Sequence, residues 1–429
     1  MKRKGIVVFS LVALAAAVFT GISLARSTST ITINVWTRDY PLAQPSPYHT
    51  AAAKFEKLHP GYKINFLGLD GDVIHQKALL SKAGGPHPDI MQTDTIWLGE
   101  MAEKGIAENL DSDYANWPGK SDYSASFLNS SKWKGHYYGV WLNTDVRILL
   151  WNKDVFRKAG LDPNKGPTTW AQVVSMGKQI QAKVPGVAGV GINAAASEDT
   201  ADYFYPFLWM AGGDILNKSW TKAAFNSPAG VKALQFYVDL VKKYKVTPKD
   251  VITQDSSSTE QSLLSGKYSI LLSQSGSGFG DDKSVKSIAA FERKIGNGVL
   301  PICPGCKPAT GSGGWLLTIN TQSKYKDLDW EFIKLATDGQ NNVAFNRAQA
   351  TVPVHTSIIN KYKNGLPGYP YFNVVAATYP HTHFRPWVPA YTTFVPYIYT
   401  AIEKAVAGQA TAKQALDDAA AKTNKALAG

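Results

Sequence analysis

The fold can be decided from the stretch Ile31-Thr32-Ile33-Asn34-Val35-Trp36, which alternates apolar and polar side chains as a half-buried β-strand does. Helices and strands are then expected in alternation, and each helix is followed by a glycine or proline stop signal. This order predicts an α/β fold with a largely parallel, helix-covered sheet. The expected elements are helices at 50–58, 71–83 and 96–105, and strands at 62–67 and 89–92.

The rest of the chain repeats the alternation. Its 429 residues exceed the roughly 250–300 at which a single core stops growing, so two domains are expected. Helices are predicted at 170–184, 229–244 and 260–265, and strands at 187–192 and 268–273.

The first residues predict an export signal. Lys2, Arg3 and Lys4 precede an apolar stretch that ends near a small-x-small cleavage site at Ser23-Leu24-Ala25. Residues 1–25 are therefore assigned to a signal peptide, and the protein is expected in the periplasm or at the cell surface. An uncleaved anchor that tethers the protein to the membrane is the alternative, since the stretch is close to spanning length.

Charge and cysteines narrow the classes of partner. The formal net charge is +12, but the lysines are spread along the chain, which favours a solvated surface over a nucleic-acid partner. Cys303 and Cys306 are the two cysteines, in a proline-rich Cys-Pro-Gly-Cys segment. A structural zinc site needs four ligands, and no second pair exists. Export favours a short disulfide, with free thiols or a redox pair as the alternatives.

Short motifs follow one another in a defined order from residue 31 to the C-terminus. The motifs are Pro88-Asp89-Ile90, Ala102-Glu103-Lys104-Gly105, Tyr138-Gly139-Val140 through Asp145, Leu149 through Phe156, Ala159-Gly160-Leu161-Asp162, Pro167-Thr168-Thr169-Trp170, Gly266-Lys267, Gly313-Gly314-Trp315-Leu316 and Arg385-Pro386. In that order they resemble the family 1 extracellular solute-binding proteins of ABC importers, a group that includes maltose- and trehalose-binding proteins.

The resemblance implies a two-lobe, periplasmic-binding-protein-like fold with a ligand cleft and hinge crossovers. The crossovers are expected near 147–151, 314–318 and 350–353. The N-lobe is then 31–147 plus 318–349, and the C-lobe 148–317 plus 350–429. The implied function is capture of a sugar, in particular a disaccharide, for the permease subunits of an ABC transporter. A monomer without cofactor, metal or catalytic activity is expected.

The N-terminal strands end in candidate ligand-binding residues. Sugar recognition uses flat apolar rings for the C–H faces and planar polar groups for the hydroxyls, on loops beyond the carboxyl ends of strands. Trp36, Arg38 and Asp39 leave the first strand, and Asp94 and Trp97 follow the third. A core tryptophan in a surface loop is the alternative for the first group. A helix N-cap is the alternative for Asp94.

Two further candidate segments come from the middle of the chain. Asp145 stands just before the first expected crossover, and by resemblance it contacts the ligand. Trp209, Gly213 and Asp214 belong to Trp-Met-Ala-Gly-Gly-Asp, whose glycines allow close backbone approach. For this segment the alternative is a helix C-cap beside a core tryptophan.

The last candidates follow the glycine pair at 313–314. Gly314 allows the loop to approach a ligand, and the family places a stacking aromatic at the position of Trp315. A packed core tryptophan is the alternative. By resemblance, Arg385 bonds sugar hydroxyls.

Two rival classes remain for comparison. A secreted glycoside hydrolase needs two carboxylates flanking one bond, and no hydrolase motif accompanies the acidic residues of this chain. A binder of the same fold could take another solute, such as a polyamine or a glycerol phosphodiester. Aromatic residues near the predicted loops favour a sugar over these.

Overall fold

The computed structural model describes residues 30–38, 47–275, 288–349 and 351–429. The predicted signal peptide (1–25) and Asp39 lie outside these ranges. Within them, no helix has both the length and the apolar character needed to cross a bilayer.

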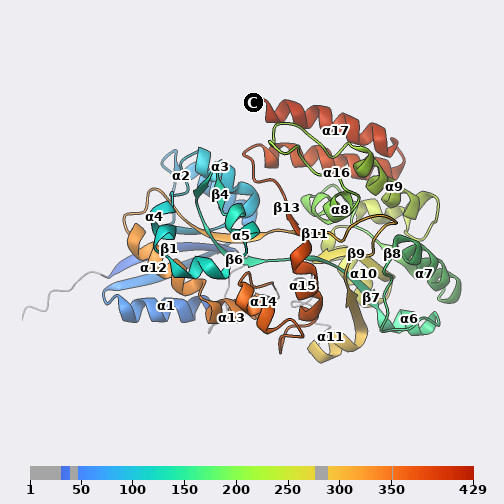
Figure 1. Cartoon of the computed structure of the whole chain (residues 1–429), viewed down its shortest axis with the longest axis horizontal. Coiled ribbons are helices and arrows are strands. Elements are labelled where there is room, and N and C mark those ends of the chain that lie inside the picture. The colour runs from blue at the N-terminus through green and yellow to red at the C-terminus, as the bar shows by residue number, and fades with distance from the viewer. Residues whose placement is uncertain (1–29, 39–46, 276–287, 350) are drawn as a thin grey trace, which may run out of the picture.

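A five-stranded sheet forms the centre of the N-lobe, the block on the left of Figure 1. β1 pairs in parallel with β2 and β3, whereas β12 runs antiparallel to both β3 and β6. The sheet is therefore mixed: β2, β1, β3 and β6 run in one direction, as predicted for a largely parallel sheet, and β12 is reversed. β12 runs opposite because it enters this sheet from the other lobe. The strands, in spatial order, are β2 (Tyr62–Leu69), β1 (Ile31–Arg38), β3 (Ile90–Asp94), β12 (Gly314–Ile319) and β6 (Val140–Thr144).

Apolar faces of both sheet and helices make the N-lobe core. Ile33 and Val35 of β1 alternate with more exposed neighbours and pack with Phe55 of α1 (Pro47–Leu58) and Phe332 of α12 (Lys326–Ala336). The other elements of this lobe are α2 (Gly71–Ser81), η1 (Thr95–Trp97), α3 (Leu98–Glu103), α4 (Asp111–Ala115), η2 (Pro118–Asp122), α5 (Ala125–Ser130), β4 (Lys132–Trp133), β5 (His136–Tyr137) and α13 (Gly339–Gln349).

A four-stranded sheet forms the centre of the C-lobe, and it too is mixed. β8 is parallel to β9, while β7 is antiparallel to both β9 and β10. The order is β10 (Ile295–Gly298), β7 (Arg147–Asn152), β9 (Tyr268–Ser275) and β8 (Ala188–Gly191). The helices are α6 (Lys153–Lys158), α7 (Trp170–Lys183), α8 (Glu198–Met210), α9 (Pro228–Lys242), η3 (Lys249–Thr253), α10 (Ser256–Ser265), α11 (Ile288–Lys294), α14 (Thr356–Lys361), α15 (Phe372–Thr378), η5 (Tyr379–His381), α16 (Tyr391–Ala407) and α17 (Ala412–Leu427).

Helix α8 occupies the interior of the C-lobe. Every residue from Thr200 to Met210 is buried, and the helix packs against α9, α16 and β11 (Thr310–Ser312). A helix that is apolar on all sides needs such a position. Its polar first turn, by contrast, lies at the boundary between the lobes.

The chain crosses between the sheets at defined places. β6 ends at Thr144 and β7 begins at Arg147, and Gly313 separates β11 from β12. Since all of β12 pairs with N-lobe strands, the second crossing lies four residues before the predicted boundary at 317. Near the third expected crossing, Val352 exchanges two backbone hydrogen bonds of 2.8 Å with Thr144.

A further connection between the lobes lies at β13 (Thr382–Phe384), which pairs with β11. The ring of Phe384 lies 5.0 Å from that of Phe127 in the N-lobe, and Trp387 Nε1 donates to the Lys132 carbonyl at 2.7 Å. The Gly99 N–H also donates to the Trp387 carbonyl at 3.1 Å. These contacts hold Arg385 between the lobes.

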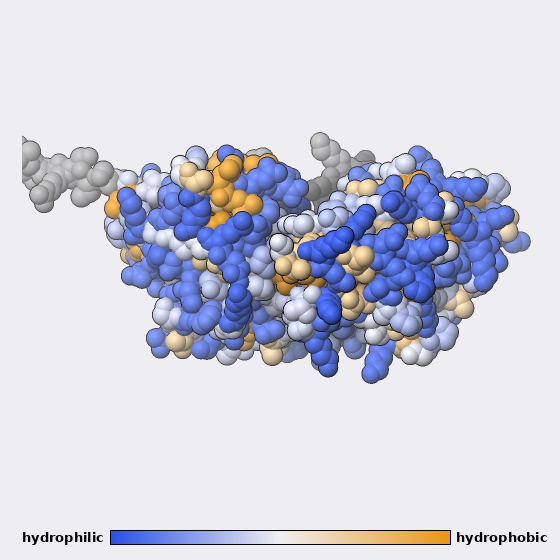
Figure 2. All heavy atoms as spheres, turned by 90° about the horizontal axis from the view of Figure 1, so that it is seen from above, coloured by the Kyte–Doolittle hydropathy of each residue, from blue (hydrophilic) through white to orange (hydrophobic). Residues whose placement is uncertain are grey.

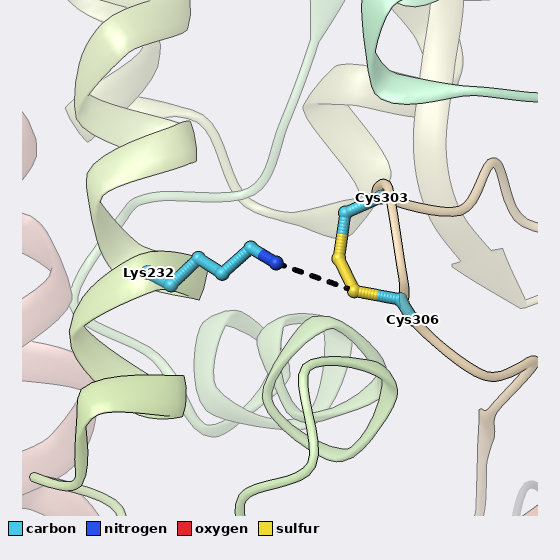
Figure 3. The surroundings of a disulfide bond; sticks show 3 residues. All are labelled: Lys232, Cys303 and Cys306. Carbon is cyan, nitrogen blue, oxygen red and sulfur yellow. Dashed lines mark hydrogen bonds between the residues drawn. A yellow bond between two sulfur atoms is a disulfide. The ribbon is translucent and has the colours of Figure 1, made fainter.

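The cysteine loop braces the far end of α8. Cys303 and Cys306 are joined in the structure, and Lys232 Nζ lies 3.6 Å from Cys306 Sγ (Figure 3). The Lys307 N–H donates to the Met210 carbonyl at 3.3 Å. On the surface, hydrophilic side chains cover most of the visible face of both lobes (Figure 2).

Candidate functional site

A cavity of about 670 Å³ lies between the two lobes. The ends of β1, β3 and β6 open into it with Arg38, Asp94 and Thr144, and the start of β12 adds Gly314. From the C-lobe come the first turn of α8, the start of α10 and part of α16. Such a position, beyond the carboxyl ends of strands, is where α/β sheets bind ligands.

The register of the N-lobe sheet brings three side chains to one level of the cavity wall. Trp315 on β12 pairs with Asp94 on one side and with Asn143 on the other. The Trp315 N–H donates to Asn143 Oδ1 at 3.2 Å, at a register shift in the β12–β6 pairing. A ring, a carboxylate and an amide are thereby fixed side by side on adjacent strands.

Two tryptophan rings form the apolar part of the wall. Trp97 meets Trp315 edge to face, with ring centroids 5.4 Å apart, and His75 stacks on Trp97 at 4.7 Å. Gly71 at the start of α2 leaves room for Trp315, because a Cβ there would lie 3.0 Å from its ring. The Arg38 guanidinium carbon lies 5.0 Å from the Trp315 ring centroid.

Arg147 is buried beneath the polar part of the wall. Its Nη1 donates to Asp145 Oδ2 at 2.7 Å and its Nη2 to Asp202 on α8. The guanidinium also lies 4.5 Å from the centre of the Tyr203 ring. Asp145 is held further by the Gly313 N–H at 2.9 Å.

Arg385 joins carboxylates from both lobes. It donates to Glu198 Oε1 at 2.7 Å, and it lies 3.4 Å from Asp94 Oδ1 and 3.8 Å from Asp202 Oδ1. Gly313 makes this placement possible, because a Cβ there would lie 2.5 Å from Arg385 Nη2. The glycine at 313 therefore admits a side chain of the protein itself.

Burial and neighbouring charges shift the pKa values of this network in opposite directions. Burial opposes ionisation of Asp145, but Arg147 and the Gly313 N–H outweigh it and hold its pKa below the ordinary value. Burial raises the pKa of Asp94, and it raises that of Glu198 to about 7 despite Arg385. The buried groups thus offer rigid hydrogen-bond acceptors and donors beside an aromatic surface, which suits a polyhydroxylated solute.

Comparison with known proteins places the chain in a family. Residues 41–342 match the sequence pattern described as bacterial extracellular solute-binding protein. The chain belongs to this family. Its members bind solutes rather than convert them, so the chain is not an enzyme.

Individual relatives of this solute-binding protein extend over nearly its whole length. A protein of Brucella abortus (strain 2308) named as a binding protein is 25% identical over 411 residues, covering 95% of this chain and 96% of its own. A solute-binding protein of Thermotoga lettingae bound with α-D-tagatose is 26% identical, with a TM-score of 0.80 over 92% of this chain and 100% of its own. The sn-glycerol-3-phosphate-binding periplasmic protein of Agrobacterium fabrum is 26% identical, covering 71% of this chain and 70% of its own.

Most of the residues predicted from the sequence meet at the cavity. The side chains or backbone that line it include Arg38, Asp94, Trp97, Asp145, Gly314, Trp315 and Arg385. Asp94 has both of the roles weighed for it, since its carboxylate also accepts the Ile96 N–H at 3.2 Å as a helix N-cap.

Trp36 does not line the cavity. It is only 5% exposed and packs in the core with Ile74, Met91 and Trp97. Trp36 and Arg38 lie two residues apart and point to the same side of β1, but they differ in their position along the strand. Arg38 is the last residue of β1 and reaches the cavity, while Trp36 lies further back and is covered by α2 and β3. The alternative of a core tryptophan describes this residue.

Trp209, Gly213 and Asp214 also lie outside the cavity lining. Trp209 is buried, stacks on His383 at 5.2 Å and donates to Asp214 Oδ1 at 3.0 Å. The N–H groups of Gly212 and Gly213 cap the end of α8 by donating to Trp209 and Leu208 carbonyls. This is the helix C-cap weighed as the alternative, with Gly212 at φ +91°.

Sequence reasoning found Arg385 but missed the other charged residues contributed by the C-lobe. Glu198 and Asp202 are four residues apart, which puts both carboxylates on one face of α8. Arg147 stands within an apolar segment that forms a fully buried strand. The sequence contained one signal for these residues, namely a charged residue inside or directly before an apolar segment. Such a residue is expected to be buried, and a buried charge requires a partner.

Proposed function

We propose that this protein captures a sugar between its lobes and delivers it to the permease subunits of an ABC importer. The carrying observation is that Trp315 and Trp97 share one cavity with fixed carboxylate, amide and guanidinium groups. The rings suit the C–H faces of a sugar, and the polar groups suit its hydroxyls. A mono- to oligosaccharide is expected, in particular a disaccharide.

Two relatives supply competing precedents for the solute. The Thermotoga lettingae structure holds α-D-tagatose, and the Agrobacterium fabrum relative is named for sn-glycerol 3-phosphate. A phosphate would need a guanidinium group free to receive it. Arg147 and Arg385 are both bound to carboxylates of the protein, which supports the sugar.

The lobes would close around the sugar by hinge motion. We place the N-lobe at about 31–145 and 314–349 and the C-lobe at about 146–313 and 351–429. The predicted role also includes export with residues 1–25 as the signal peptide, action as a monomer, and a Cys303–Cys306 disulfide in the mature protein.

Thermal denaturation against a solute panel tests the proposal. A ligand that binds the folded state stabilises it by RT ln(1 + [L]/Kd), so a sugar that binds should raise the unfolding midpoint. The panel contains mono- and disaccharides, with sn-glycerol 3-phosphate and putrescine as the rival classes. A rise with either rival and with none of the sugars would contradict the proposed function. Small-angle scattering with a solute that binds should then show a smaller radius of gyration.

A further inference from the structure

The cavity has a charge opposite to that of the whole chain. Eight carboxylate side chains line it against three arginines, although the chain carries a formal net charge of +12. Acidic residues are thus concentrated in the cavity between the lobes. Clefts lined by one sign of charge raise the local concentration of solutes of the other sign.

The two buried arginines do not cancel this charge. Arg147 and Arg385 are shared among Asp94, Asp145, Glu198 and Asp202. Four carboxylates therefore surround two guanidinium groups in the buried part of the wall. An anionic solute would meet Arg147 and Arg385 already paired with carboxylates, and Arg38 lying over the Trp315 ring.

The remaining four acidic side chains come from both lobes. Asp70 and Asp72 lie at the start of α2 in the N-lobe, and Asp199 and Glu260 lie on α8 and α10 in the C-lobe. Closing the lobes on a neutral solute would leave these charges facing one another. A positive charge on the solute would be attracted from both sides.

Asp202 faces arginines with both of its oxygens, since Oδ2 accepts from Arg147 and Oδ1 lies 3.8 Å from Arg385 Nε. One further contact inside the cavity agrees with a cationic group. The guanidinium of Arg38 lies over the Trp315 ring, so this ring already accommodates a cation on its face.

The titration of Glu198 agrees with an excess of negative charge. Burial raises its pKa to about 7, and Asp202, Asp199 and Asp94 add to the rise while Arg385 opposes it. The carboxylates contribute to this rise after burial, which is its largest cause.

We propose that the cavity prefers a sugar bearing a protonated amino group over the same sugar without one, and that it rejects the phosphorylated form. This inference rests on the proposed function, since it concerns the same cavity. The amino group lies among the acidic side chains of both lobes, with Asp70 and Asp72 on one side and Asp199 and Glu260 on the other. The sugar ring retains its contact with the tryptophans.

Calorimetric titration at neutral pH with matched solutes tests the inference. The probes are glucose, its 2-amino and 6-amino derivatives and glucose 6-phosphate, and trehalose with its 6-amino derivative and trehalose 6-phosphate. For at least one scaffold, an amino form should bind about tenfold or more tightly than the neutral form, and the phosphate at least tenfold more weakly. Raising ionic strength from about 0.02 to 0.5 M should shrink the amino preference, because salt screens exposed charges.

A pair of variants ties the preference to the cavity. Asp199→Asn removes one acidic group of the cavity lining that lies outside the arginine network, and should reduce the amino preference severalfold. Asp327→Asn is the matched control, because Asp327 is also in the first turn of a helix but lies outside the cavity lining. It should leave the preference unchanged.

The outcomes separate the inference from the proposed function. Neutral sugars that bind as tightly as, or more tightly than, every amino form would overturn the inference and leave the sugar assignment intact. Binding of putrescine but of none of the sugars would overturn both. An equal loss of preference in Asp199→Asn and Asp327→Asn would also contradict the inference, because the effect would then be one of overall charge.

Discussion

Two segments of this protein pair a tryptophan with two glycines, and they have different roles. Trp209, Gly212 and Gly213 form the end of an interior helix, whereas Gly313, Gly314 and Trp315 form the entry of a strand into the N-lobe sheet. Trp209 is 6% exposed and packs in the core, while Trp315 is more exposed and lines the cavity.

The glycines of the two segments are also required for different structural reasons. Gly212 has a φ of +91° and ends α8, with open space around a Cβ. Gly313 is packed against Arg385, and Gly314 has a φ of +134° and would place a Cβ 2.3 Å from the Asn143 carbonyl. Composition alone therefore does not identify a binding segment. What decides is whether the segment lies at the end of a strand that faces the other lobe.

The largest effect is expected from Trp209→Ala. Removing a buried tryptophan leaves a cavity, so the free energy of unfolding should fall by about 3–5 kcal/mol. The protein that remains folded should bind its sugar within about twofold of the parent. Urea denaturation and calorimetric titration on the same preparation measure both quantities.

Trp315→Ala should show the reverse pattern. Loss of the aromatic wall should weaken sugar binding by about 2–4 kcal/mol, as for buried aromatic anchors elsewhere. This corresponds to roughly 30- to 1000-fold in affinity. The free energy of unfolding should fall less than in Trp209→Ala, because the Trp315 ring is partly open to the cavity. Unchanged affinity with a large loss of stability would make Trp315 a core residue and break the comparison.

The sequence predicted the fold better than the pairing of its strands. Apolar periodicity located β1 (Ile31–Arg38), α7 (Trp170–Lys183) and α9 (Pro228–Lys242) to within a few residues. It could not predict that β12 runs antiparallel between β3 and β6, since this strand comes from a distant part of the chain. Local patterns contain no information on which strand a long crossover will meet.

The site was predicted on the N-lobe side, whereas on the C-lobe side only Arg385 was predicted. Asp94 and Trp315 follow or begin strands, so a rule on strand ends finds them. Glu198 and Asp202 lie on a helix, and only the packing of α8 between the lobes brings them to Arg147 and Arg385. Such contacts depend on tertiary packing, and the spacing along the chain does not encode them.

A smaller effect is expected from opening the cysteine loop that braces the end of α8. Replacing both Cys303 and Cys306 with serine should lower the free energy of unfolding by about 2 kcal/mol, the chain-entropy value for so short a loop. Sugar affinity should not change, because neither residue lines the cavity. Thiol titration of the denatured, unreduced parent should find no free thiol, and two reactive thiols would contradict the disulfide.

The smallest effect is expected for Glu198, in the first turn of α8 at the cavity. It compares this end of the helix with the end that holds Trp209 in the core. An unperturbed glutamate has a pKa of 4.5, and the folded protein raises the pKa of Glu198 to about 7. Between these pH values the folded state retains a proton that the unfolded state has lost, so stability falls as the pH rises through this window. The side chain is 34% exposed, and solvent screening reduces the expected fall to about 1 kcal/mol.

Glu198→Gln should remove that fall, and the difference between variant and parent isolates it. Asp329 also has a pKa raised to about 7, but it is present in both proteins and cancels in the difference. Asp145 acts in the other direction and at lower pH: its lowered pKa stabilises the fold above about pH 4, and this contribution is lost on further acidification.

Denaturation of the parent and of Glu198→Gln at pH 4.5, 6 and 7.5 should thus give stability curves that diverge only as the pH rises. Trp209→Ala, at the other end of the helix, should shift the curve by the same amount at each pH. Parallel curves for Glu198→Gln would mean that Glu198 has the same pKa in the folded and the unfolded state, and the end of α8 at the cavity would then differ from its core end in packing alone.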